Sequence, residues 1–341
     1  MRISELKTYM PKLIAGNDPV VLVAGPGVGK TEVILSAAKE MGYKAKLFHP
    51  AVSDPTDFKG QPYAYLEDGK AKARHLPYED LDCLIQAEEP TVAFFDDMGQ
   101  ATPATQAALM QPFQQREVSG HKISDKVKFI GATNRAEDKA GVASMIEPLK
   151  GRATLINVET HPDDWCAWAY EQEDMPPEIP AFIRFRPELL NNFKPSRDMN
   201  NTPTPRNWSR VANKLRNKLD SFELIAGDIG EEATGQFKSF VKIMNDLPDV
   251  DDVINNPHTA KVPDKKEPSV MYALMGALSY KSRPGTIEGI TEYLSRVPAE
   301  FSVMCMQDCI AKNKTNSTFR NHKAVTKWCI EHQDVMGLFA G

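Results

Sequence analysis

The segment of residues 24–31, which reads AGPGVGKT, constrains the fold of this chain more than any other. It matches the pattern G-x-x-x-x-G-K-[ST], except that Ala24 takes the place of the first glycine. An apolar run at residues 20–24 precedes it, and residues 31–41 have the apolar spacing of a helix. A glycine-rich turn between a buried strand and a helix points backbone N–H groups at an anion, and the positive end of the helix adds to that field. The segment therefore predicts an α/β domain with a phosphate-binding loop.

We expect this loop to bind ATP together with Mg²⁺. Lys30 is expected to bridge the β- and γ-phosphates, and the Thr31 hydroxyl is expected to ligate the metal. The alternative is a glycine turn before an ordinary helix, which the flanking strand and helix disfavour. The predicted ATP-binding residues are Gly25, Pro26, Gly27, Val28, Gly29, Lys30 and Thr31.

A second apolar strand ends in two acids, in the sequence VAFFDD at residues 92–97. Asp96 is predicted to hold the Mg²⁺ hydration shell together with Thr31. Asp97 is then the residue that orients or deprotonates the attacking water. The alternative interpretation is that these acids cap the helix that follows.

Strand-like and helical segments alternate as far as about residue 158. The predicted strands are residues 20–24, 44–49, 91–96, 127–133 and 152–158. Strands separated by helices favour a parallel sheet with right-handed crossovers. We therefore predict an α/β core with a five-stranded parallel sheet.

The rest of the chain is predicted to be mostly helical. Residues 176–205 hold seven of the 25 prolines, which excludes a long helix there. Helical spacing follows at residues 207–219, 269–279, 286–296, 299–311 and 319–335. The predicted division is 1–158 for the nucleotide-binding core, 159–245 for a helical lid and 246–341 for a helical C-terminal extension.

Composition narrows the class of protein. The 41 Lys+Arg and 46 Asp+Glu give a net charge of −5, which disfavours non-specific nucleic-acid binding as the main activity. No run approaches the roughly 20 apolar residues of a membrane span. The cysteines are odd in number, and no apolar signal peptide is visible, so we expect free thiols and a cytoplasmic protein. The basic residues of segment 296–327 are interpreted as a solvated helix face rather than a binding patch.

An ordered set of motifs resembles the AAA+ ATPases, and within them the MoxR-like branch. Besides the phosphate loop, the set comprises FFDDMGQATPATQAALMQPFQQREVSG, FIGATNR, EPLKGRATLINV and TPRNWSRVANKL. The resemblance covers residues 20–215 and implies an AAA+ fold with an α-helical lid. It also implies ATP hydrolysis in a ring, expected to be a homo-hexamer. MoxR-like proteins often work with a partner of von Willebrand A type, which becomes the expected partner.

The resemblance assigns roles to further residues. Asn134 matches the sensor-1 residue, which hydrogen-bonds the γ-phosphate or the attacking water. Arg152 matches the arginine finger that acts on the neighbouring subunit's nucleotide, with Lys150 as a rival for that role. Arg206 matches the sensor-2 arginine, which reaches the nucleotide of its own chain. The family usually has Glu where this chain has Asp97, a side chain that is one methylene shorter.

Two segments resemble the family's insertions that face the central pore, namely residues 57–75 and 116–125. The second has the character of a β-hairpin. Solvated surface loops are the alternative for both.

Three hypotheses follow for function. The main one is an ATP-driven ring that remodels or activates a partner protein. The second is a nucleotide-gated scaffold with weak turnover, suggested by the short side chain of Asp97. The third is a DNA-handling AAA+ ATPase, which the net charge and the lack of an added DNA-binding motif disfavour.

Overall fold

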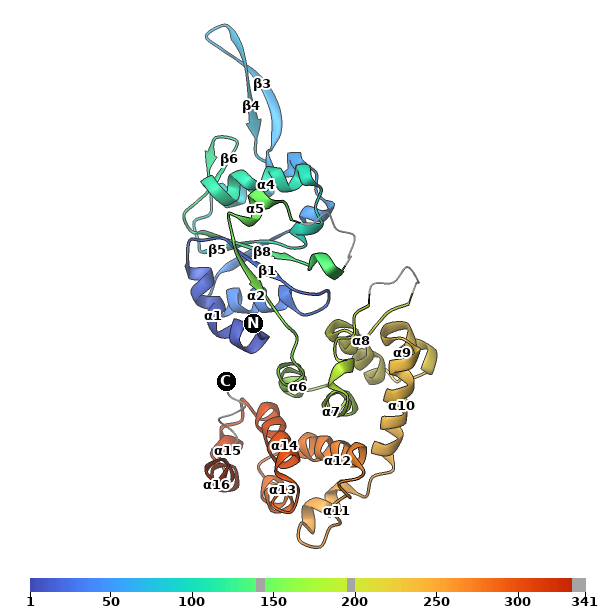
Figure 1. Cartoon of the computed structure of the whole chain (residues 1–341). Coiled ribbons are helices and arrows are strands. Elements are labelled where there is room, and N and C mark those ends of the chain that lie inside the picture. Colours follow the sequence, from blue (N-terminus) through green and yellow to red (C-terminus); the bar gives the residue numbers. More distant parts are fainter. Residues whose placement is uncertain (139–144, 195–199, 333–341) are drawn as a thin grey trace. The chain divides into compact units, whose positions relative to one another are not determined.

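The computed structural model describes residues 1–138, 145–194 and 200–332, and the chain divides into two compact units. The first unit comprises Met1–Thr160 and a short segment at Phe193, and the second unit begins at His161. Figure 1 shows the elements of both units. The boundary at Thr160 lies close to the predicted end of the core at residue 158. Apart from residues 159–160 and the short segment at Phe193, the segments predicted as lid and C-terminal extension fall within one unit.

A five-stranded parallel sheet forms the centre of the first unit, as predicted. Its strand order is β2-β5-β8-β1-β9, with parallel pairing throughout. Strand β5 is buried along its whole length, because both faces of the sheet are covered. The strands are β1 (Val20–Val23), β2 (Lys44–Phe48), β5 (Thr91–Phe95), β8 (Val127–Thr133) and β9 (Thr154–Asn157).

Two hydrophobic cores lie against this sheet. One contains Leu6 of α1 and Ile34 of α2 with Leu22 of β1, and the other contains Leu109 of α4 with Phe95 and Phe129. Burial of such apolar side chains is the dominant stabilising term in folding. The helices of the unit are α1 (Ile3–Ala15), α2 (Lys30–Glu40), α3 (Glu79–Ile85), α4 (Pro103–Gln115) and α5 (Glu147–Lys150).

Two β-hairpins interrupt the α/β alternation. Strands β3 (Gln61–Glu67) and β4 (Lys70–Leu76) form a long antiparallel pair that projects beyond the rest of the unit (Figure 1). Every residue of β4 is exposed. The shorter pair, β6 (Glu117–Val118) and β7 (His121–Lys122), confirms the hairpin predicted at residues 116–125.

The second unit is helical. Its helices are α6 (Pro162–Glu171), α7 (Glu178–Phe185), α8 (Pro205–Arg216), α9 (Phe222–Ile229), α10 (Glu231–Asn245), α11 (Val250–Asn255), α12 (Pro268–Lys281), α13 (Ile287–Leu294), α14 (Ala299–Lys312), α15 (Ser317–Arg320) and α16 (Lys323–Glu331). No helix of the described ranges is both long and apolar enough to cross a bilayer.

The prediction of a single helix at residues 319–335 is wrong. Within the described part of that segment the chain turns between α15 and α16, where the His322 ring accepts a hydrogen bond from the backbone N–H of Ala324 (3.3 Å) and caps α16. A side-chain acceptor at a helix N-terminus satisfies a donor that would otherwise lack a partner. Residues 333–335 lie outside the described residues.

Helix α12 joins the two cores of the second unit. Its Ala273 belongs to the core that contains Phe182 and Trp208, whereas its Met275 belongs to the core formed with α13 and α14. The predicted lid and the predicted extension therefore share one central helix.

Candidate nucleotide site

The predicted site residues gather at one edge of the sheet. Strands β1, β5 and β8 are parallel, and Val23 stands in register with Thr133 while Phe95 stands in register with Gly131. The chain leaves these strands into the phosphate loop, into Asp96 and into Asn134, respectively. Parallel strands bring their carboxyl ends together, so three separate sequence segments meet here.

The phosphate loop depends on glycine at two positions. Gly27 and Gly29 have φ angles of 73° and 99°, a region in which a side chain is strained. Ala24 is not among the residues with positive φ, and its N–H donates to the Thr133 carbonyl (3.2 Å). An alanine is therefore tolerated at the first position of the pattern.

Helix α2 begins directly after this loop. Its N-cap is Gly29, which has no side chain to accept hydrogen bonds from the first-turn N–H groups. Those donors and the positive end of the helix face the space beyond the loop. This is the arrangement in which a helix N-terminus binds phosphate.

Lys30 lies folded against the loop and is only 8% exposed. Its Nζ donates to the carbonyl oxygens of Ala24 and Gly25, both at 3.1 Å, and to Oδ1 of Asn134 at 2.7 Å. The structure thus brings the two predicted residues Lys30 and Asn134 into direct contact. An ammonium group can exchange such acceptors for phosphate oxygens with little movement.

The two predicted metal ligands also lie together. Thr31 Oγ1 donates to Oδ2 of Asp96 (2.9 Å), and the backbone N–H of Asp97 donates to the other oxygen of Asp96 (3.0 Å). Hydroxyl and carboxylate oxygens are the donors that Mg²⁺ prefers. These two residues fit an Mg²⁺ ion that keeps several of its waters.

Asp97 follows Asp96 in the left-handed conformation, with φ of 53°. Gln100 donates from Nε2 to Oδ1 of Asp97 (2.9 Å) and so fixes the carboxylate. A Cβ on Gly99 would lie 2.1 Å from Thr133 Oγ1, so only glycine permits this turn to approach β8. Gln100 was missed by the sequence analysis, although a polar side chain three residues after an acid is a usable signal.

The structure does not support the alternative interpretation, in which the carboxylates of these two acids cap the helix that follows. Helix α4 is capped by Thr102, whose hydroxyl accepts from the N–H of Thr105 (3.2 Å). The carboxylate of Asp96 is bound to Thr31 instead.

Arg135 is a second residue that the sequence analysis missed. Its guanidinium pairs with Asp138 (3.1 Å) and Glu137 (3.3 Å), and the hydrogen bond to Asp138 raises the pKa of Arg135. The same group lies beside the phosphate loop, since a Cβ on Gly25 would be 3.4 Å from it. The sequence feature that could have identified Arg135 is its position directly after Asn134 in the motif FIGATNR.

Arg152 lies at the opposite edge of the sheet. It precedes β9, whose first residue Thr154 pairs with Val20 at the start of β1, whereas the loop follows the end of β1. Its Nε donates to Oε1 of Gln114 (2.7 Å). Lys150, the rival candidate, is paired with Glu147 (2.6 Å). Strand β1 therefore separates Arg152 from the loop of its own chain.

Arg206 belongs to the second unit, in the first turn of α8. Thr204 caps this helix by accepting from the N–H of Asn207 (3.2 Å), and Pro205 is the first helical residue. Arg206 is exposed, and its side chain makes no hydrogen bond or ion pair within the described ranges. Its contact with the nucleotide stays a prediction.

Comparison with known proteins bears on the first unit. Residues 20–155 match the family described as AAA, ATPase family associated with various cellular activities. This segment is therefore an AAA ATPase family domain, and it contains the loop, both acids, Asn134 and Arg152. A search of curated protein sequences finds no match to the chain.

Solved structures give looser likenesses. A point mutant of Thermotoga maritima RuvB is 16% identical with a TM-score of 0.40, over 82% of this chain and 79% of that chain. The Thermotoga maritima RuvB Holliday junction branch migration motor is 15% identical with a TM-score of 0.41, over 82% of this chain and 81% of that chain. Such likenesses do not define a function.

Proposed function

We propose that the chain is a ring-forming ATPase whose catalytic site is shared by two copies, and that it uses hydrolysis to remodel or activate a partner protein. The observation that carries the proposal is the placement of its polar residues. Lys30, Thr31, Asp96 and Asn134 meet at the carboxyl edge of the sheet, while Arg152 lies at the other edge.

The residues of this edge have distinct tasks in the proposed reaction. The N–H groups of the loop and of the first turn of α2 bind the phosphates, and Lys30 exchanges its carbonyl acceptors for β- and γ-phosphate oxygens. Thr31 and Asp96 hold Mg²⁺, which supplies charge neutralisation to the phosphates when bound. Asn134, already within 2.7 Å of Lys30, then contacts the γ-phosphate or the water.

Asp97 supplies the acid–base function. Held by Gln100, its carboxylate orients the attacking water and accepts the proton that the water loses. Its position directly after the residue that holds the metal favours hydrolysis over the scaffold hypothesis.

Arg152 completes the site from a neighbouring copy. A planar guanidinium stabilises the charge that spreads over the γ-phosphoryl oxygens in the transition state. Because strand β1 separates Arg152 from its own loop, only another copy can present it to this nucleotide. A ring, which we propose to have six subunits, gives every site such a neighbour.

The finer assignments rest on the resemblance in sequence. They are the MoxR-like branch, a sensor-2 role for Arg206, a partner of von Willebrand A type and a cytoplasmic location. We also propose, on the same basis, that the two hairpins of the first unit face the pore.

Substitution of Lys30 tests the ATPase proposal. We expect Lys30→Ala to lower the rate of ATP turnover at least about 100-fold, because the ammonium neutralises charge on the transferred phosphoryl group. The measurement is steady-state phosphate release with Mg²⁺ present. Lys39→Ala is the matched control, since Lys39 is an exposed lysine on the same helix and should leave the rate unchanged. Wild-type turnover in the Lys30 variant would rule the proposal out.

A further inference from the structure

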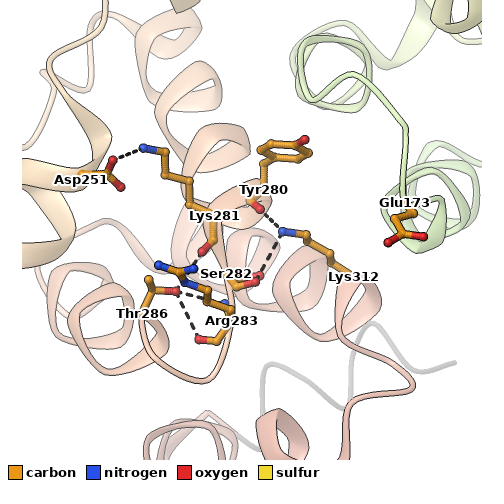
Figure 2. Close-up of a pocket in the computed structure, with 8 residues that line it drawn as sticks. All are labelled: Glu173, Asp251, Tyr280, Lys281, Ser282, Arg283, Thr286 and Lys312. Atoms are coloured by element: carbon orange, nitrogen blue, oxygen red, sulfur yellow. Dashed lines mark hydrogen bonds and ion pairs between the residues drawn. The ribbon is translucent and has the colours of Figure 1, made fainter. Parts of the chain in front are cut away.

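A pocket of about 520 Å³ lies within the second unit, and none of its lining residues belongs to the nucleotide site. Figure 2 shows the side chains around it, which come from the loop after α6, from α11, from the end of α12, from the α12–α13 turn and from α14. The volume falls within the range of small-molecule sites, roughly 300–1,000 Å³. Three of its side chains are cations: Lys281, Arg283 and Lys312.

Only one of these cations is neutralised by an acid among the described residues. Lys281 forms an ion pair with Asp251 (2.5 Å), which Figure 2 shows as a dashed line. Lys312 donates to backbone carbonyl oxygens at the end of α12, those of Tyr280 and Ser282, and no carboxylate of the described ranges contacts it. The side chain of Arg283 is exposed and makes no hydrogen bond or ion pair there either.

The two uncompensated cations repel each other. Burial lowers the pKa of Lys312, and the nearby charge of Arg283 lowers it further. The repulsion between two like charges that line one pocket destabilises the folded protein. An anion bound between them would offset that repulsion.

The turn that carries Arg283 is held rigidly. Thr286 Oγ1 accepts from the Arg283 N–H (3.0 Å) and donates to the Lys281 carbonyl (2.9 Å). Next to it, the buried side chain of Asn313 donates to Oγ of Ser282 (2.9 Å). A backbone fixed in this way presents its side chain without a further entropic cost of ordering the loop.

Glu173 also lines the pocket, and it comes from the loop after α6, a segment separate from those that carry the cations (Figure 2). It is exposed and makes no hydrogen bond or ion pair with the described residues. Its carboxylate repels anions, so it selects a ligand that carries a hydrogen-bond donor beside its negative group.

We propose that this pocket binds a small anionic molecule, through a phosphate or carboxylate group held by Arg283 and Lys312, with a donor group directed at Glu173. The site lies in the helical unit and is separate from the residues that bind ATP. It does not depend on the ATPase proposal, because binding alone tests it.

Calorimetric titration of the full chain tests the pocket directly. The Lys30→Ala background is used to weaken phosphate binding at the loop, and ionic strength is held constant. The probes are inorganic phosphate and citrate, which separate a phosphate source from a carboxylate source. Saturable binding of either probe, or of both, is the expected result.

Variants then place the binding in the pocket. Arg283→Ala should weaken affinity about 10-fold or more, since a hydrogen bond to a charged group contributes about 1.5–3 kcal/mol. Glu173→Gln should strengthen affinity about twofold or more, because it removes a repulsive charge. Arg320→Ala, an exposed arginine outside the pocket, should have no effect. Absence of saturable binding for both probes, or unchanged affinity in Arg283→Ala, overturns the proposal.

Discussion

The backbone of Asp97 accounts for the residue type found there. Its φ of 53° lies in the left-handed region, which aspartate adopts more readily than longer or branched side chains. The hydrogen bond from Gln100 to the Asp97 carboxylate then fixes the direction of the acid. A short acid in a fixed position is consistent with a base that acts through a water molecule.

Substitution by the isosteric amide separates chemistry from binding at this position. Asp97→Asn keeps the size of the side chain and tolerates the same φ, but it cannot accept a proton. We expect kcat to fall about 100- to 10,000-fold, the usual contribution of a general base, while the dissociation constant for ATP stays within about twofold. Rapid-quench turnover and equilibrium nucleotide binding measure the two quantities.

The matched control for this prediction is Asp125→Asn. Asp125 is an exposed acid of the same unit whose ion-pair partner, Lys122, is 3.5 Å away. Its substitution should change neither quantity. Wild-type turnover in the Asp97→Asn variant would show that Asp97 is not the general base.

The residues of this site differ in how far the sequence could predict them. Lys30, Thr31 and Asp96 come together because local pattern and strand order place them there. The contact of Gln100 with Asp97 and the position of Arg135 beside the loop are not revealed by any periodicity in the sequence. The turn at Asp97 also depends on the close approach of Gly99 to Thr133, which is a tertiary contact.

At the scale of elements, a buried ion pair connects α7 to α14. Arg184 donates from its terminal nitrogen to Asp308 (2.5 Å) and from Nε to the other oxygen (3.3 Å), and it also contacts Asp163 of α6. The side chains of Arg184 and Asp308 are only 8% and 2% exposed. Burial raises the pKa of Asp308, and the bonds from Arg184 oppose that rise.

Breaking this pair on one side should be costly. Arg184→Met leaves the carboxylate of Asp308 buried without its partner, so we expect a loss of about 3–5 kcal/mol in the free energy of unfolding. The double variant Arg184→Met with Asp308→Leu should lose much less free energy of unfolding, because the buried carboxylate is removed together with its partner. Urea denaturation followed by tryptophan fluorescence is suited to this cycle, since all 4 tryptophans lie in the second unit.

A surface ion pair serves as the control for that cycle. Lys327 and Glu331 are 3.8 Å apart on an exposed face of α16, and Lys327→Ala should cost less than about 1 kcal/mol. If the effects of Arg184→Met and Asp308→Leu on the free energy of unfolding were additive, Arg184 and Asp308 would not interact energetically.

Helix boundaries in this unit show what the sequence pattern could not supply. Helices α9 and α10 were not predicted, although Ser221 caps α9 by accepting from the N–H of Leu224 (3.4 Å). The chain between α15 and α16 was predicted as helix because its apolar spacing continues, yet local capping by His322 ends that continuity. The boundaries of these helices therefore depend on capping and tertiary packing rather than on apolar periodicity.

At the scale of the whole molecule, the predicted lid and C-terminal extension belong to one unit. Helix α12 lies in both of its cores, and the pair of Arg184 and Asp308 joins the two segments. If Arg206 of this unit senses the nucleotide, as we propose, the C-terminal helices move with it. The pocket at Arg283 would then lie on the moving body.

The central claim is that the ATPase site is completed by a second copy of the chain. Mixing Lys30→Ala subunits with Arg152→Ala subunits tests it most directly. Each variant alone should be inactive, since an arginine finger contributes about 10³–10⁵ to kcat. In an equal mixture, random assembly of a ring pairs an intact loop with an intact neighbouring arginine at about a quarter of the sites. Recovery of about a quarter of wild-type turnover is predicted, and a mixture as inactive as its two components would contradict the account.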